Sequence, residues 1–134
     1  MSRIVRCGLV QTRNDTPITE PLGKIKEAMI AKNIALVEEA GQKGVQVLCL
    51  QEIFYGPYFC AEQNPRWYAT AERIPEGPTV KLMRDLAIKY RMVIIVPIYE
   101  EEMTGVYYNT AAVIDADGTF LGRYRKTHIP HCWP

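Results

Sequence analysis

The sequence lacks a strong net charge, a long apolar run and a signal peptide. Its 134 residues carry 16 Lys and Arg against 15 Asp and Glu, a formal net charge of +1. This balance excludes the basic surface that attracts nucleic acid, so we expect no nucleic-acid partner. The longest apolar run, residues 92–98, is too short to span a bilayer, and residues 1–10 hold no continuous apolar segment. We therefore expect a cytoplasmic protein with no membrane partner.

Paired cysteines and metal motifs are also missing. The four cysteines, Cys7, Cys49, Cys60 and Cys132, show no CxxC spacing, and without a secretion signal we expect reduced thiols. Cys7 and Cys49 fall in apolar strands, where a free cysteine behaves as a small hydrophobic residue.

Two clusters could suggest a metal site. His128, His131 and Cys132 lie close in sequence, but a tetrahedral structural site needs a second cluster. The run Glu100-Glu101-Glu102 is interpreted as part of an exposed hairpin loop over residues 100–105, because adjacent residues cannot converge on one ion. We expect no metal.

What is present is an alternation of apolar strands and amphipathic helices without repeats, linkers or low-complexity segments. Strands are predicted at residues 4–11, 45–51, 92–98, 106–114 and 119–125, and helices at 22–40 and 79–90. The first strand, helix and strand form a βαβ unit with parallel strands. The Asp-Gly pair before residue 119 indicates a tight antiparallel turn. The prediction is one α/β domain with a mixed sheet.

Glu52 and Lys126 each follow a predicted strand. Glu52 emerges from a mostly buried strand, where burial and a neighbouring cation can tune a carboxylate as a general base. Lys126 directly follows a predicted strand, and three basic residues lie at this end, Lys126 among them. A fixed ammonium group can stabilise an oxyanion. The alternatives are an ordinary strand-end acid and an edge lysine that discourages aggregation. Arg123 and Arg125 are interpreted in this second way.

The two positions lie in segments that match a known family in order and spacing. Residues 50–52 (Leu-Gln-Glu), 107–111 (Tyr-Tyr-Asn-Thr-Ala) and 122–130 (Gly-Arg-Tyr-Arg-Lys-Thr-His-Ile-Pro) resemble the nitrilase superfamily of carbon-nitrogen hydrolases. With the aromatic loop 54–60, they resemble in particular the branch of β-ureidopropionases and N-carbamoyl amine or amino-acid amidohydrolases. The similarity spans essentially the whole chain.

The resemblance implies a fold, a chemistry and a set of site residues. The fold is the N-terminal part of an α-β-β-α sandwich, with helices on one face of a mixed sheet. The chemistry is a Glu-Lys-Cys triad without a cofactor, acting on a small carbamoyl or amide substrate in a homo-oligomer. Glu52 would be the general base and Lys126 the oxyanion stabiliser, while His128 and Tyr55 would contact the substrate.

The family's nucleophilic cysteine has no counterpart in residues 1–134. Cys132 neighbours two histidines, but it stands at the chain end, where a held geometry is least expected. We therefore expect an incomplete domain over residues 1–134 that is inactive alone and active as part of a longer protein. The alternative is a short product that binds a partner without turnover. A nucleotide-binding module ranks last, because residues 8–12 hold no glycine-rich phosphate loop.

Overall fold

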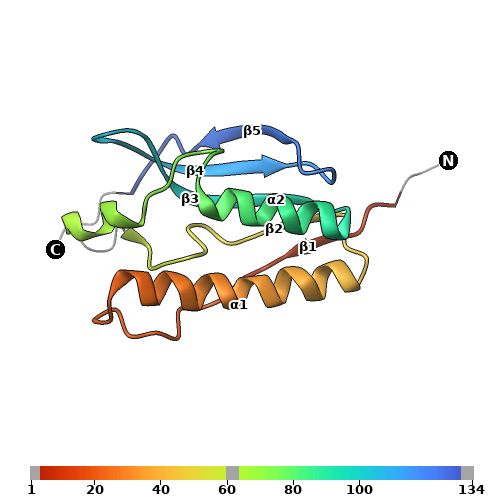
Figure 1. Cartoon of the computed structure of the whole chain (residues 1–134), viewed down its shortest axis with the longest axis horizontal. Helices are drawn as coiled ribbons and strands as arrows, with labels where there is room; N and C mark the ends of the chain where they lie inside the picture. Colours follow the sequence, from red (N-terminus) through yellow and green to blue (C-terminus); the bar gives the residue numbers. More distant parts are fainter. Residues whose placement is uncertain (1–3, 60–63, 131–134) are drawn as a thin grey trace.

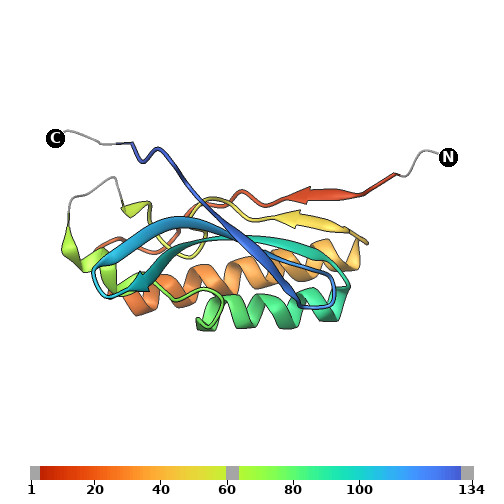
Figure 2. The same ribbon diagram turned by 90° about the horizontal axis from the view of Figure 1, so that it is seen from above.

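The computed structural model describes residues 4–59 and 64–130, which form one sheet with two helices on one of its faces (Figure 1). The elements in chain order are β1 (Cys7–Leu9), α1 (Leu22–Gln42), β2 (Val47–Cys49), the 3-10 helix η2 (Pro65–Thr70), α2 (Pro78–Tyr90), β3 (Val93–Met103), β4 (Val106–Ile114) and β5 (Phe120–Arg125). Figure 2 shows α1 and α2 on the same side of the strands. The predicted mixed α/β sheet with helices on one face is confirmed.

The five strands lie in sequence order, and their pairing changes direction at β3. β1 with β2 and β2 with β3 are parallel, whereas β4 is antiparallel to both β3 and β5. Parallel strands need crossover connections, which α1 and the segment containing α2 supply. The antiparallel strands are joined by short turns at Gly105 and Gly118, whose φ angles of 85° and 84° suit glycine.

The core lies between the helices and the sheet. Every fourth residue along part of α1 is buried, which places one stripe of the helix against the strands. The buried residues of α1 are Ile25, Met29, Asn33 and Val37, and those of α2 are Thr79, Val80, Met83, Leu86 and Ala87. The sheet contributes the fully or almost fully buried Leu48, Ile94, Val96, Ile98, Ala112 and Ile114.

The opposite face of the sheet is largely apolar, and neither α1 nor α2 lies on it. Strand alternation puts Leu9, Cys49, Ile95, Ala111, Val113 and Tyr124 on this face, all of them half-buried or exposed. Leu9 is 86% exposed and Tyr124 is 64% exposed. An apolar sheet face of this kind is typical of a surface that packs against another layer.

The predicted hairpin loop over residues 100–105 is wrong. β3 continues to Met103, and the Glu100 side chain is fully buried. Arg123 and Arg125, interpreted from the sequence as plain edge-strand cations, both form ion pairs with it. Paired arginines allow a carboxylate to be buried, because they replace the hydration it loses.

The two cysteines within the described residues are free thiols, of which Cys7 is exposed and Cys49 is half-buried. Cys60, Cys132 and His131 lie outside the described residues. Within residues 4–59 and 64–130, neither helix has the length and apolar character needed to cross a membrane.

Candidate active site

Glu52 lies where the chain leaves the parallel part of the sheet. The backbone of Leu50 still pairs with β3, through a 3.1 Å hydrogen bond from its N–H to the Ile95 carbonyl. Glu52 then opens a turn that includes Ile53, whose φ of 49° lies in the left-handed region. A β-branched residue adopts this conformation only where its surroundings enforce it. The direction of the Glu52 side chain is therefore set by the turn that follows it.

The core enforces this turn. Ile53 is 2% exposed, and the Phe54 N–H donates to the Pro97 carbonyl on β3 at 3.4 Å. From the helical layer, the buried Asn33 side chain donates to the Phe54 carbonyl at 3.4 Å. Contacts from the sheet and from α1 thus hold the backbone next to the carboxylate.

Lys126 follows the last residue of β5 and meets Glu52 directly. Its Nζ donates to Glu52 Oε1 at 2.6 Å, across a sequence separation of 74 residues. Its backbone N–H donates to the Asn109 carbonyl on β4 at 2.8 Å. The Lys126 and Glu52 side chains are 36% and 46% exposed, so the pair is open to a solute.

Asn109 is a third member of the site, and sequence reasoning did not single it out. Its Nδ2 donates to the same Glu52 Oε1 at 2.6 Å, and only 5% of the residue is exposed. Asparagine is depleted in strands, so an Asn within the predicted strand at residues 106–114 was the signal that the sequence offered. Asn109 contacts Glu52 through its side chain and Lys126 through its backbone.

The electrostatics of the pair keep Lys126 protonated. The hydrogen bond from Lys126 to Glu52 raises the pKa of the lysine, and this effect outweighs the loss of solvation at the site. The Tyr58 ring lies 5.7 Å from Nζ and also favours the cation. The described site therefore presents an ammonium group and a side-chain amide that both donate to the same carboxylate oxygen.

A groove of about 420 Å³ runs from Glu52 along the ends of β1 and β2. It is lined by Leu9, Val10, Gln11, Thr12, Cys49, Leu50, Gln51 and Glu52. The Gln51 side chain is held in place by the Thr12 backbone N–H and hydroxyl, which both donate to its Oε1. Burial raises the pKa of the Cys49 thiol, so this cysteine stays neutral and is a poor nucleophile at neutral pH.

The other two predicted site residues, His128 and Tyr55, lie in opposite environments, one exposed and one buried. His128 is exposed and is two positions beyond Lys126 in the chain. Tyr55 is fully buried, and its hydroxyl lies 2.9 Å from the Thr70 carbonyl and 3.1 Å from the Tyr99 carbonyl. Burial raises the pKa of this phenol. Tyr55 therefore supports the turn after Glu52 from inside and exposes no surface to a substrate.

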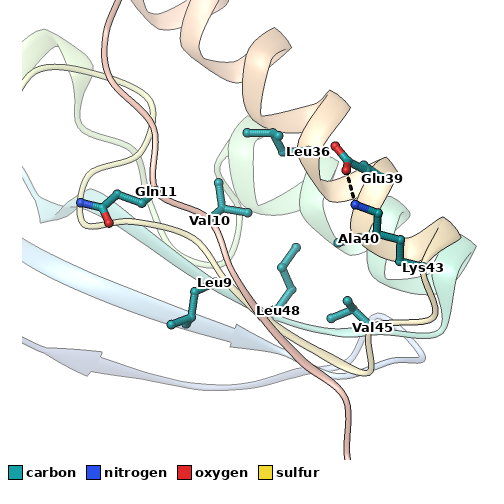
Figure 3. Close-up of a pocket in the computed structure, with 10 residues that line it drawn as sticks. Leu9, Val10, Gln11, Leu36, Glu39, Ala40, Lys43, Val45 and Leu48 are labelled. Atoms are coloured by element: carbon teal, nitrogen blue, oxygen red, sulfur yellow. Dashed lines mark hydrogen bonds and ion pairs between the residues drawn. The ribbon is translucent and has the colours of Figure 1, made fainter.

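A second hollow, of about 260 Å³, lies between β1 and α1 (Figure 3). Its walls include the apolar side chains Leu36, Val45 and Leu48, and its charged residues Glu39 and Lys43 form an ion pair with each other. Glu39 and Lys43 form a local i,i+4 pair with side chains 54% and 68% exposed, whereas Glu52 is also held by the buried Asn109. This hollow therefore offers weaker grounds for chemistry than the groove at Glu52. Across residues 4–59 and 64–130, no cluster of His, Cys, Asp or Glu is arranged to hold a metal.

The fold and the site together define an α/β protein that carries an acid-ammonium pair at the ends of its strands. Comparison with known protein families adds the family: the sequence model of the carbon-nitrogen hydrolase family matches residues 9–134. The chain belongs to the carbon-nitrogen hydrolase family. The resemblance seen in the sequence is thereby confirmed.

Individual relatives agree with this assignment. A β-ureidopropionase of Arabidopsis thaliana is 37% identical over 130 residues, which are 96% of this chain and 32% of the relative. An N-carbamoylputrescine amidase of Solanum lycopersicum is 43% identical over 105 residues, 75% of this chain and 35% of the relative. The crystal structure of a carbon-nitrogen hydrolase from Helicobacter pylori G27 superposes with a TM-score of 0.78 at 29% identity, covering 94% of this chain and 40% of that one. The chain spans about a third of the length of these curated relatives.

Proposed function

We propose that the protein hydrolyses a carbon-nitrogen bond of a small N-carbamoyl amine or N-carbamoyl amino acid and releases ammonia. The observation that carries this proposal is the 2.6 Å contact between Lys126 Nζ and Glu52 Oε1 beside an open groove. The names of the relatives, a β-ureidopropionase and an N-carbamoylputrescine amidase, support the carbamoyl substrate class.

Each site residue has a role in this proposal. The Glu52 carboxylate is the general base, since it accepts hydrogen bonds but carries no proton of its own when ionised. Lys126 stabilises the negative oxygen that forms when the carbonyl is attacked, because its ammonium group is held at a fixed position. Asn109 orients Glu52, and His128 contacts the substrate beyond the lysine.

The nucleophile of this proposal is a cysteine that is not among residues 1–134. A thiolate, formed as Glu52 takes the thiol proton, attacks the ureido carbonyl carbon. Collapse of the tetrahedral intermediate breaks the bond to the terminal nitrogen, which leaves as ammonia with the proton from Glu52. Water, deprotonated by Glu52, then cleaves the S-carbamoyl enzyme and regenerates the thiol. The released carbamate loses carbon dioxide to give the amine.

The test is ammonia release by the protein expressed from its complete reading frame. The substrates are N-carbamoyl-β-alanine and N-carbamoylputrescine, with a simple amide and a nitrile as comparison substrates. We expect turnover of at least one carbamoyl compound. Turnover of the amide or nitrile alone would contradict the carbamoyl assignment but keep the class of reaction. Absence of ammonia release from all four compounds would contradict the hydrolase proposal and favour a non-catalytic binding role.

A further inference from the structure

A buried ionic cluster lies directly beneath the candidate site, on the helix side of the sheet. Its centre is Glu100 on β3, whose side chain is fully buried. Thr110 Oγ1 donates to Glu100 Oε2 at 2.6 Å, and Arg125 donates to both carboxylate oxygens, from Nε at 3.0 Å and from Nη2 at 2.7 Å. Arg123 Nη1 adds a fourth hydrogen bond at 2.6 Å. The carboxylate is therefore fully satisfied away from water.

The cluster and the site are built on adjacent residues of the same two strands. Thr110 and Arg125 are register partners across β4 and β5. The residue before Thr110 is Asn109 and the residue after Arg125 is Lys126, and these two contact Glu52. Because successive side chains of a strand point to opposite faces, a fixed Thr110 and Arg125 set the positions of Asn109 and Lys126.

The end of β5 needs such an anchor. β5 is the last strand in the sheet order, and among residues 4–59 and 64–130 its strand partner is β4. Its end at Arg125 therefore has strand hydrogen bonds on one side alone, and edge segments of this kind open at low free-energy cost. A guanidinium that holds one carboxylate through two nitrogens fixes both distance and orientation. The contact from Arg125 on β5 to Glu100 on β3 reaches across β4 and so links three strands.

We propose that Glu100 is a positioning residue for the reaction: through Arg125 and Thr110 it fixes Lys126 and Asn109 against Glu52. The inference rests on the proposed function for its kinetic consequence. A catalytic ammonium displaced by about 1 Å can cost up to about 100-fold in rate. The buried carboxylate therefore acts on the reaction without contact with the substrate.

The test compares three variants of the protein expressed from its complete reading frame. Glu100→Gln keeps the size of the side chain but removes its charge, and Thr110→Val keeps the β-branched shape but removes the hydroxyl. Glu39→Gln is the matched control, because it removes an exposed carboxylate of α1 that pairs with Lys43, the residue after the helix. The measurements are kcat and KM for ammonia release, and hydrogen exchange of the Lys126 backbone N–H, which donates to the Asn109 carbonyl.

We expect Glu100→Gln to lower kcat by about 10- to 100-fold with KM changed less than about twofold, and to accelerate exchange at Lys126. Thr110→Val should do the same to a smaller extent, and Glu39→Gln should match the wild type in both measurements. Thr110→Val also carries the test if Glu100→Gln does not fold. A folded Glu100→Gln protein with a lower melting temperature but unchanged kcat and unchanged Lys126 exchange would overturn the proposal, since a purely structural role predicts that result.

The exchange measurement separates this inference from the proposed function. If the wild type releases no ammonia, the hydrolase proposal fails, yet faster Lys126 exchange in Glu100→Gln still supports the anchoring of the strand end. If the wild type is active and the variant retains wild-type kcat and exchange, only the positioning role fails.

Discussion

Asn109 and Thr110 are neighbours on β4, and they donate hydrogen bonds to two different carboxylates on opposite sides of the sheet. Asn109 Nδ2 reaches Glu52 Oε1 at 2.6 Å, and Thr110 Oγ1 reaches Glu100 Oε2 at 2.6 Å. One carboxylate is open to solvent beside a groove, and the other is fully buried. A single strand thus connects the proposed chemistry with the ionic cluster beneath it.

Replacement of Glu52 by Gln tests the general base. The amide cannot take a proton from a thiol or from water, so we expect kcat to fall by at least about 100-fold. The fold should persist, because the Glu52 side chain is 46% exposed. Ammonia release and circular dichroism are the measurements. Unchanged turnover in a folded variant would remove Glu52 from the mechanism.

Replacement of Asn109 tests the orientation of that base. Asn109→Ala removes one of two hydrogen bonds to Glu52 Oε1, and we expect about a tenfold loss of kcat. Asn109→Asp keeps the size of the side chain but places a second carboxylate against Glu52, and like charges repel each other. We therefore expect a larger loss of kcat for ammonia release in Asn109→Asp than in Asn109→Ala. Equal kcat values for the two variants would contradict direct contact between residue 109 and Glu52.

The titration of Lys126 follows from its raised pKa. The hydrogen bond to Glu52 raises this pKa above the ordinary value of 10.5, so the pair contributes stability below that pH and loses it as pH rises through the folded-state value. Glu52→Gln should move the pKa of Lys126 back toward 10.5. NMR titration of the lysine side chain, assigned with Lys126→Arg, measures the shift. An equal pKa in wild type and Glu52→Gln would show that the pair is not formed in solution.

Glu72 tests a second buried contact, which joins α1 to the start of α2. Its carboxylate accepts hydrogen bonds from the Thr79 N–H and hydroxyl at the start of α2, and it pairs with Lys26 of α1 at 2.5 Å. The Glu72 and Lys26 side chains are 5% and 20% exposed. Glu72→Ala leaves the partly buried Lys26 ammonium without its carboxylate and the start of α2 without its side-chain acceptor, and we expect a loss of about 3 kcal/mol in the free energy of unfolding.

Denaturation by urea measures this loss. The matched control is Glu20→Ala, which removes the half-buried i,i+4 partner of the exposed Lys24 and should cost at most about 0.5 kcal/mol. Equal effects of the two substitutions would show that burial does not strengthen the Glu72 contact.

Glu100 should also shape the acid stability of the protein. Burial by itself raises the pKa of this carboxyl, but hydrogen bonds from Arg125 and Thr110 and the charge of Arg123 together lower it below 4.5. A lowered pKa means that the ionised form stabilises the fold above about pH 4.5, and that this stability is lost as pH falls through the folded-state value. Glu100→Gln should flatten the pH dependence of the free energy of unfolding below pH 4.5. An unchanged slope would assign the acid sensitivity to other carboxylates.

The fold followed from local patterns, whereas the details of the site depended on distant partners. Hydrophobic periodicity predicted both long helices and the strand at residues 106–114, because one covered face repeats along each element. The sequence analysis predicted Glu100 in an exposed loop, because a run of charges typically indicates a solvated turn. Its arginine partners lie 23 and 25 residues away in the chain, so the local pattern did not reveal them. Asn109 was missed for the same reason, since Glu52 is 57 residues distant. Tyr55 was predicted to contact the substrate from the aromatic loop, whereas the structure buries it with its hydroxyl against the Thr70 and Tyr99 carbonyls.

The left-handed Ile53 has a consequence for how this protein would lose function. A β-branched residue in that conformation is strained by about 1–3 kcal/mol, and it is kept there by the interior that surrounds it. The direction of the Glu52 side chain therefore depends on the packing around Ile53. Slight loosening of this packing, by heat or by a mutation remote from the groove, should allow the turn to change conformation. The proposed ammonia release should then be lost while the helices are still intact.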